Sequence, residues 1–261
     1  MAPVVAVRRD SGNREQALAR LEPWVAKARR FSGWDFADIR VRELDPGPRW
    51  NYARIVRDHG AGSNAVLDMG TGGGELLTTL RPSFPGSVIA TEELSRNAPV
   101  AFQRLRPLGV SVVRCRSLRL PFFDSTFDLV IDRHEEFSPQ EVGRVLAPGG
   151  VFITQQVGQS EWCELRSFFP RMTEFGDLRS VYSEEFDRIG FRVESEEHTY
   201  RVAYPSLGEI VFMLGVAPWM VPDFDLNRDL DSLLEFEAHC SAADGLVVTE
   251  SRFLMIARKP G

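Results

Sequence analysis

The chain has 261 residues, of which 43% are hydrophobic and 26% charged, a composition typical of one large α/β domain or of a core with a modest cap. Its formal net charge of −6 argues against the broad basic surface that binds nucleic-acid phosphates. It also lacks the run of about 18 apolar residues that a membrane-spanning helix needs.

Three further classes of protein are not expected from the N-terminus, the cysteines and the histidines: secreted, disulfide-rich and metal-binding proteins. Residues 1–9 place their basic side chains after the apolar ones and have no long apolar core, unlike a signal peptide, so a cytoplasmic location is expected. Cys115, Cys163 and Cys240 are too widely spaced for a disulfide framework or a zinc pair. The four histidines are equally scattered, and no metal site is expected.

An aromatic-rich segment precedes the core. Residues 11–31 carry apolar side chains at helical spacing, and a strong breaker at 45–48 ends the segment that follows. Its aromatics form either a hydrophobic lid or part of a ligand pocket. Trp50 and Tyr52, at the start of the next helix, are the leading candidates for a pocket wall.

A glycine-rich turn organises the chain. Residues 65–67 predict a short buried strand that ends at Asp68, and a helix is expected over 75–80. The turn between them holds four glycines, which allow backbone conformations that other residues avoid. Strand, turn and helix form the nucleotide-binding corner of a doubly wound sheet. Glu75 stands where a dinucleotide fingerprint has its third glycine, and no P-loop lysine follows. Acids on both sides of the turn, Asp68 and Glu75, suit a ligand with a cationic or hydroxyl-rich surface.

The segment 68–75 resembles motif I of the class I S-adenosylmethionine-dependent methyltransferases. The resemblance implies that S-adenosylmethionine is the cofactor and S-adenosylhomocysteine the product. It also implies contacts with the cofactor from the residues of this turn, which are Asp68, Gly70, Thr71, Gly72 and Gly74.

The next two strands supply further candidates. Residues 87–91 predict a strand that ends at Glu92, the position at which Rossmann-type sites bind a ribose diol; the alternative is a solvated carboxylate. Residues 110–115 predict the third strand. The loop after it resembles the family segment Gly-Asp-Ala-x-x-Leu-Pro-Phe, whose Asp accepts from the adenine amino group. Arg116 stands at that position, a departure that leaves Ser117 and Leu118 as the expected contacts with the base.

Residues 125–132 resemble the Ser-Phe-Asp-Leu-Val motif and predict the fourth strand. Asp132 and Arg133, at its end, are expected beside the cofactor. His134 is a candidate general base because histidine has a pKa near neutrality; its alternative is a backbone hydrogen bond or a place beside the cofactor's methionine end. Glu135 could bind a cationic or amine acceptor; the alternatives are that it caps the next helix or is solvated. A helix over 139–146, a turn over 147–150 and a strand over 151–157 complete the family's landmarks.

The rest of the chain predicts helices over 181–189 and 206–214, an extended segment over 191–200 and a final antiparallel strand over 252–258. The expected fold is α/β, a doubly wound and mostly parallel seven-stranded sheet of the Rossmann-like methyltransferase type, with an aromatic-rich cap. The chain is expected to be a single domain over 1–261, with an N-terminal helical cap (1–50), a cofactor-binding half (51–157) and a C-terminal half with substrate-cap insertions (158–261). Trp219, in one such insertion, joins Trp50 and Tyr52 as an expected acceptor contact.

The resemblance implies in-line displacement of the methyl group, in which the protein mainly positions the two partners. The expected function is methyl transfer to an O, N or C nucleophile of a small molecule, in secondary metabolism. The expected partner is that small-molecule acceptor, without nucleic acid or membrane, and the protein is expected to be a monomer or a homodimer. The alternatives are an RNA or protein methyltransferase, or a non-catalytic S-adenosylmethionine-binding protein. The Arg116 departure leaves the last alternative open, while the glycines and Glu92 argue against it.

Overall fold

A computed structural model describes residues 11–261 of the chain. The first nine residues lie outside this range, so the absence of a signal peptide and the cytoplasmic location stay predictions. In residues 11–261 no helix combines the length and the apolar character needed to cross a membrane.

Within the described residues, one mixed sheet of nine strands runs through the molecule. Its spatial order is β1-β7-β9-β6-β5-β2-β3-β4, and β8 pairs only with β9. The strands are β1 (Arg42–Glu43), β2 (Ala65–Met69), β3 (Ser87–Thr91), β4 (Val110–Val113), β5 (Phe127–Arg133), β6 (Leu146–Val157), β7 (Arg192–Tyr204), β8 (Ser241–Ala242) and β9 (Gly245–Arg258). Neighbours from β4 to β6 are parallel, and β9 is antiparallel to both β6 and β7.

The predicted doubly wound sheet with an antiparallel last strand is confirmed. The predicted number of seven strands differs from the nine observed because of β1 and β8, which have two residues each. Strands this short carry no alternation of apolar and polar residues that a sequence could reveal.

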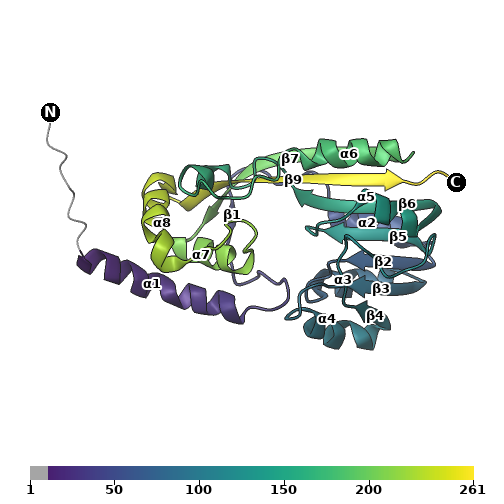
Figure 1. Ribbon diagram of the computed structural model, residues 1–261, viewed down its shortest axis with the longest axis horizontal. Helices are drawn as coiled ribbons and strands as arrows, with labels where there is room; N and C mark the ends of the chain where they lie inside the picture. Colours follow the sequence, from purple (N-terminus) through teal and green to yellow (C-terminus); the bar gives the residue numbers. More distant parts are fainter. Residues whose placement is uncertain (1–10) are drawn as a thin grey trace.

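Helices cover both faces of the parallel strands (Figure 1). The α-helices are α1 (Ser11–Arg30), α2 (Tyr52–Gly60), α3 (Glu75–Leu80), α4 (Ala98–Leu105), α5 (Pro139–Val145), α6 (Leu178–Arg188), α7 (Leu207–Val216) and α8 (Leu226–Cys240). Short 3-10 turns lie at Arg81–Ser83, Arg106–Leu108 and Cys163–Ser167. One core packs α2, α3 and α4 against the sheet, and another packs α5 and α6 against its other face. Because both faces are covered, the central strand β5 carries the continuous apolar run 129–131.

A third core lies beyond the end of the parallel strands. It contains buried residues of α1, α7 and α8 together with the far halves of β7 and β9. Figure 1 shows these helices as a separate group to one side, joined to the main sheet by the two long strands. The aromatic cap expected from the N-terminus and the late segments is therefore a helical layer on a sheet extension.

Strand β9 connects the cores through residues on one of its faces. Alternate residues of a strand share a face. Leu246 and Val248 belong to the cap core, whereas Leu254 and Ile256 contact the core under α2, α3 and α4. The same face therefore carries a polar stretch between two apolar ones.

Several element boundaries differ from the prediction. Strand β6 begins at Leu146, so it includes the expected turn, and β7 and β9 pair from Arg192 to Tyr204, well beyond the predicted segments. Helix α8 was not predicted, although Leu226, Leu230 and Leu233 follow helical spacing and are buried. Asp225 caps this helix by accepting from the backbone N–H groups of its first turn.

Candidate functional site

The glycine turn between β2 and α3 has the backbone that only glycine adopts easily. Gly70, Gly72 and Gly74 have φ angles of 63°, 64° and 80°. A Cβ atom on Gly70 would lie 2.6 Å from Cβ of Glu135, and one on Gly72 would lie 2.8 Å from Cβ of Trp34. The absence of side chains at Gly70 and Gly72 therefore lets Glu135 and Trp34 pack directly on the backbone of the turn. Thr71 is buried in it, and its backbone N–H donates to the Thr91 carbonyl at 2.8 Å.

Glu92 follows β3 and is only 5% exposed. Its Oε2 accepts from the Gly72 N–H at 2.8 Å and its Oε1 from the Leu94 N–H at 2.7 Å. The carboxylate thus stabilises the glycine turn directly. Each oxygen keeps a further lone pair with which it could accept a hydroxyl proton.

Four carboxyl groups gather where β2, β3 and β5 end: Asp68, Glu92, Asp132 and Glu135. Burial, reinforced by the charge of Glu92, raises the pKa of Asp68 to about 7. Burial likewise raises the pKa of Glu135 to about 7 and holds that of Asp132 well above its ordinary range. Within residues 11–261 none of the four forms an ion pair with a basic side chain. The site is therefore suited to a cation.

The loop after β5 places Glu135 over the glycine turn. Its backbone N–H donates to Asp132 Oδ1 at 3.2 Å, and its Oε1 accepts from the Ser117 hydroxyl at 3.1 Å. The alternative that Glu135 caps the next helix is wrong. Ser138 caps α5, because its hydroxyl accepts from the Glu141 N–H.

His134 adopts a left-handed backbone conformation with φ 65°, and its N–H donates to the Gln155 carbonyl at 2.9 Å. Burial, together with the charges of Arg252 and Arg133, holds the pKa of His134 well below 6.5. The expectation of a pKa near neutrality is therefore wrong, although the neutral ring can still accept a proton. Its buried Nδ1 and the buried Oδ2 of Asp132 have no hydrogen-bond partner.

Buried polar atoms without partners are costly, so these two mark positions where a ligand would supply hydrogen bonds. A ligand that carries a sulfonium, an ammonium group and a ribose diol fits this donor set. The carboxylates match the cations, and Glu92 matches the diol. The residues present therefore fit S-adenosylmethionine. Within the described residues no group of three metal-ligating side chains comes together.

The two residues expected beside adenine differ in burial. Ser117 is buried and bonded to Glu135, whereas Leu118 is 44% exposed. Arg116 forms an ion pair with Glu93 at 2.7 Å and is largely exposed. The side chain that departs from the family pattern thus points to a surface carboxylate.

The aromatic residues predicted to contact the acceptor lie in different places. Trp50 Nε1–H donates to Gln155 Oε1 at 2.9 Å, and the buried Tyr52 donates its hydroxyl proton to the Asp132 carbonyl at 2.8 Å. Both connect α2 to the ends of β5 and β6. Arg133 lies directly opposite Gln155 in the sheet and is exposed.

Trp34 is the aromatic residue that lies against the glycine turn, and its ring stacks on the exposed Trp219 with centroids 6.0 Å apart. The sequence ranked it below Trp50 and Tyr52, because an aromatic run does not show which ring will face the turn. Glu75 secures this segment. It accepts from the Trp34 N–H at 3.3 Å and from the Gly73 N–H at 2.9 Å, and it pairs with Arg104. The sequence suggested that Glu75 faces a ligand. In the structure its carboxylate binds protein groups instead.

The chain matches a family model described as a methyltransferase domain over residues 66–150. It is 29% identical to the ubiquinone/menaquinone biosynthesis C-methyltransferase UbiE of Desulfotalea psychrophila, over 42% of this chain and 48% of that protein. It therefore spans about half the length of that relative. It is 26% identical to the 23S rRNA (guanine(748)-N(1))-methyltransferase of Streptomyces fradiae, over 76% of this chain and 74% of that protein.

Among solved structures, the YcgJ protein of Bacillus subtilis superposes with a TM-score of 0.60 at 17% identity, covering 80% of this chain and 98% of that one. This likeness shows the fold. The matched residues contain the glycine turn, Glu92 and the loop after β5. Residues 66–150 therefore match a methyltransferase domain, and the fold around them is the Rossmann-like fold of methyltransferases.

Proposed function

We propose that the protein transfers a methyl group from S-adenosylmethionine to an O, N or C nucleophile of a small molecule. The observation that carries the proposal is the group of four carboxyls without basic partners around a glycine turn. When bound, the cofactor supplies an electrophilic methyl group on a sulfonium. The protein positions the two reactants and excludes water.

In this proposal the two sides of the glycine turn bind different parts of the cofactor. Glu92 accepts from the ribose hydroxyls, and the region of Ser117 and Leu118 contacts the base. Asp68 and Glu135 lie nearest the cationic part, and Asp132 and Arg133 complete the wall at the end of β5. The product, S-adenosylhomocysteine, has lost the sulfonium charge and is therefore held less strongly by these carboxylates.

The acceptor binds beyond β5 and β6, between the parallel strands and the cap. Trp50 and Tyr52 lie on one side of this region, and Trp34 and Trp219 lie on the side of the glycine turn. In this proposal the segments before residue 51 and after residue 157 select the acceptor. His134 is the proposed base for an acceptor that must lose a proton, and its lowered pKa makes it a weak one.

An RNA methyltransferase is the second candidate. The Streptomyces fradiae relative, named for 23S rRNA, matches over 76% of this chain, more than the C-methyltransferase does. The acidic net charge favours the small molecule. A screen with labelled methyl groups separates the two: we expect label in phenols, amines or activated carbons, and not in an rRNA transcript. Label in RNA or in protein would support those alternatives, and binding without any transfer would support a non-catalytic binder.

Affinity for S-adenosylmethionine is expected to rise as pH increases from 5.5 to 7.5. Asp68 and Glu135, with pKa values of about 7, are protonated below that pH in the free protein, and the cationic cofactor favours their ionised forms. Binding at pH 6 must therefore release protons, and the gain should be roughly tenfold per proton released per pH unit at most. Titration calorimetry in buffers of different ionisation enthalpy measures the affinity and the proton release together.

The matched variant for this prediction is Glu135→Gln, which removes one of the two titrating groups and keeps the shape of the side chain. It should bind the cofactor with a weaker pH dependence. An affinity that stays constant between pH 5.5 and 7.5 in the parent would contradict the role of the carboxyls, and absence of binding at every pH would contradict the function.

A further inference from the structure

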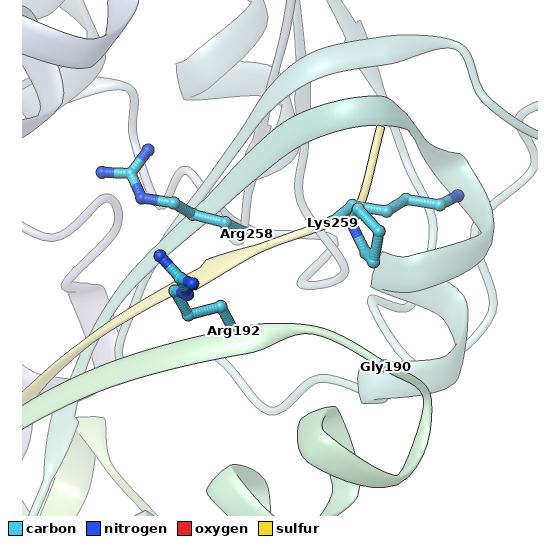
Figure 2. Close-up of a pocket in the computed structure, with 5 residues that line it drawn as sticks. Gly190, Arg192, Arg258 and Lys259 are labelled. Carbon is cyan, nitrogen blue, oxygen red and sulfur yellow. The ribbon is translucent and has the colours of Figure 1, made fainter.

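Two arginines face each other at the edge of the sheet opposite the cofactor turn. Arg192 begins β7 and Arg258 ends β9, and the two are direct partners in the antiparallel register. Partners of this kind share a face, and like charges in such pairs are destabilising. Figure 2 shows both guanidinium groups on the same side of the strands, with the Lys259 side chain pointing away from them.

The described part of the chain gives neither arginine an ion-pair partner. Among residues 11–261 neither arginine lies within ion-pair distance of a carboxylate. Arg258 donates to Nε2 of His59 at 2.9 Å, and His59 Nδ1 lies 2.9 Å from the Ile55 carbonyl. Because a guanidinium group can only donate, Nε2 of His59 accepts from Arg258, and this contact orients the Arg258 side chain.

A third cation adds to the positive potential. Lys259 donates from Nζ to the carbonyls of Gly143 and Leu146, each at 2.7 Å, where α5 ends. Its ammonium group is therefore hydrogen-bonded to the backbone, and residues 11–261 offer it no ion-pair partner. A pocket opens at this point, lined by Gly190, Arg192, Arg258, Lys259 and Pro260 (Figure 2).

We propose that Arg192 and Arg258 form a binding site for a phosphate group. Two planar guanidinium forks on one face match the oxygens of a phosphate, and its negative charge removes the repulsion between them. The phosphate can belong to a free phosphate or phosphomonoester, or to the phosphodiester backbone of a nucleic acid.

The site is separate from the cofactor turn. Arg258 pairs with Val151, which lies opposite Leu129 near the beginning of β5, whereas Arg252 pairs with Val157 at the end of β6. Six residues of strand correspond to about 20 Å. Binding at the arginine pair can therefore be tested whether or not the protein transfers methyl groups.

The test is titration of the full chain with inorganic phosphate at constant ionic strength, followed by calorimetry and by thermal unfolding. We expect saturable binding that weakens by roughly tenfold or more in Arg192→Gln and in Arg258→Gln, because each variant loses one charged fork. Arg201→Gln is the matched control, since Arg201 lies on the same strand but is paired with Asp45. It should bind phosphate as the parent does.

The repulsion between Arg192 and Arg258 leads to a second prediction, which would not hold if the two arginines were only structural. Without phosphate, Arg192→Gln should raise the melting temperature by about 1 to 3 °C, and saturating phosphate should abolish this advantage. Equal stabilisation by chloride and phosphate, or phosphate binding that both substitutions leave intact, would overturn the proposal. Competition by glycerol 3-phosphate or by a short single-stranded RNA then distinguishes a phosphomonoester from a phosphodiester.

Discussion

Replacement of Glu92 by glutamine is expected to lower the affinity for S-adenosylmethionine by about a hundredfold or more. The carboxylate accepts from the N–H groups of Gly72 and Leu94 in a site that is only 5% exposed. A glutamine retains one acceptor oxygen and turns an NH₂ group toward one of these donors. In the proposed complex Glu92 also accepts from the two ribose hydroxyls, and each charge-assisted hydrogen bond is worth about 1.5 to 3 kcal/mol, so the loss of these two accounts for the expected effect.

Calorimetric titration with S-adenosylmethionine and S-adenosylhomocysteine measures the effect. Glu93→Gln is the matched control, because Glu93 is adjacent but pairs with Arg116 at the surface. It should bind within about threefold of the parent. Unchanged binding by Glu92→Gln, in a variant whose circular dichroism matches the parent, would contradict the assignment of Glu92 to the cofactor site.

Replacement of Arg252 by methionine is expected to lower the free energy of unfolding by about 3 to 5 kcal/mol. Arg252 is 15% exposed and contacts both Glu161 and Glu250 on the polar stretch of β9 between the two apolar cores. Tyr200 donates its hydroxyl proton to Glu250 at 2.7 Å in the same network. Without the guanidinium, two nearly buried carboxylates lose their counter-charge.

Urea unfolding monitored by circular dichroism measures this cost. The control is Arg201→Met, whose partner Asp45 lies 2.7 Å away in a pair that is 60% exposed on the arginine side. It should cost far less than Arg252→Met, because exposed ion pairs add little to stability. Adding Glu161→Gln to Arg252→Met should recover part of the loss, because it removes one uncompensated charge. Equal small losses in the two arginine variants would show that the network adds nothing beyond surface pairs.

The sequence predicted the parts of the site that depend on local geometry. The positive φ angles of Gly70, Gly72 and Gly74 follow from the need for a sharp turn between strand and helix. Parallel strands joined by right-handed crossovers place their carboxyl ends at one edge, so Asp68, Glu92 and Asp132 had to lie near one another. These features require only short-range rules and the order of the elements.

The sequence could not predict which residues of the cap contact the glycine turn. Trp34 faces Gly72 because Glu75 and Asn97 bind the backbone of residues 33 and 34, and these contacts join residues 41 and 64 positions apart. Helix α8 was not predicted, although its apolar spacing is regular, because it lies outside the sequence motifs of the family. The full lengths of β7 and β9 likewise depend on their pairing with each other.

What the sequence by itself determined is the doubly wound sheet and the position of the glycine turn, because glycine conformation and apolar periodicity act over a few residues. Only the tertiary structure decided the charge states. Burial lowers the pKa of His134, and the charge of Arg252, over a hundred residues away, lowers it further; the pKa of Glu135 is raised because the fold buries it near Glu92. Electrostatic energies depend on burial and on distances between groups, and a linear sequence contains neither until the chain has folded.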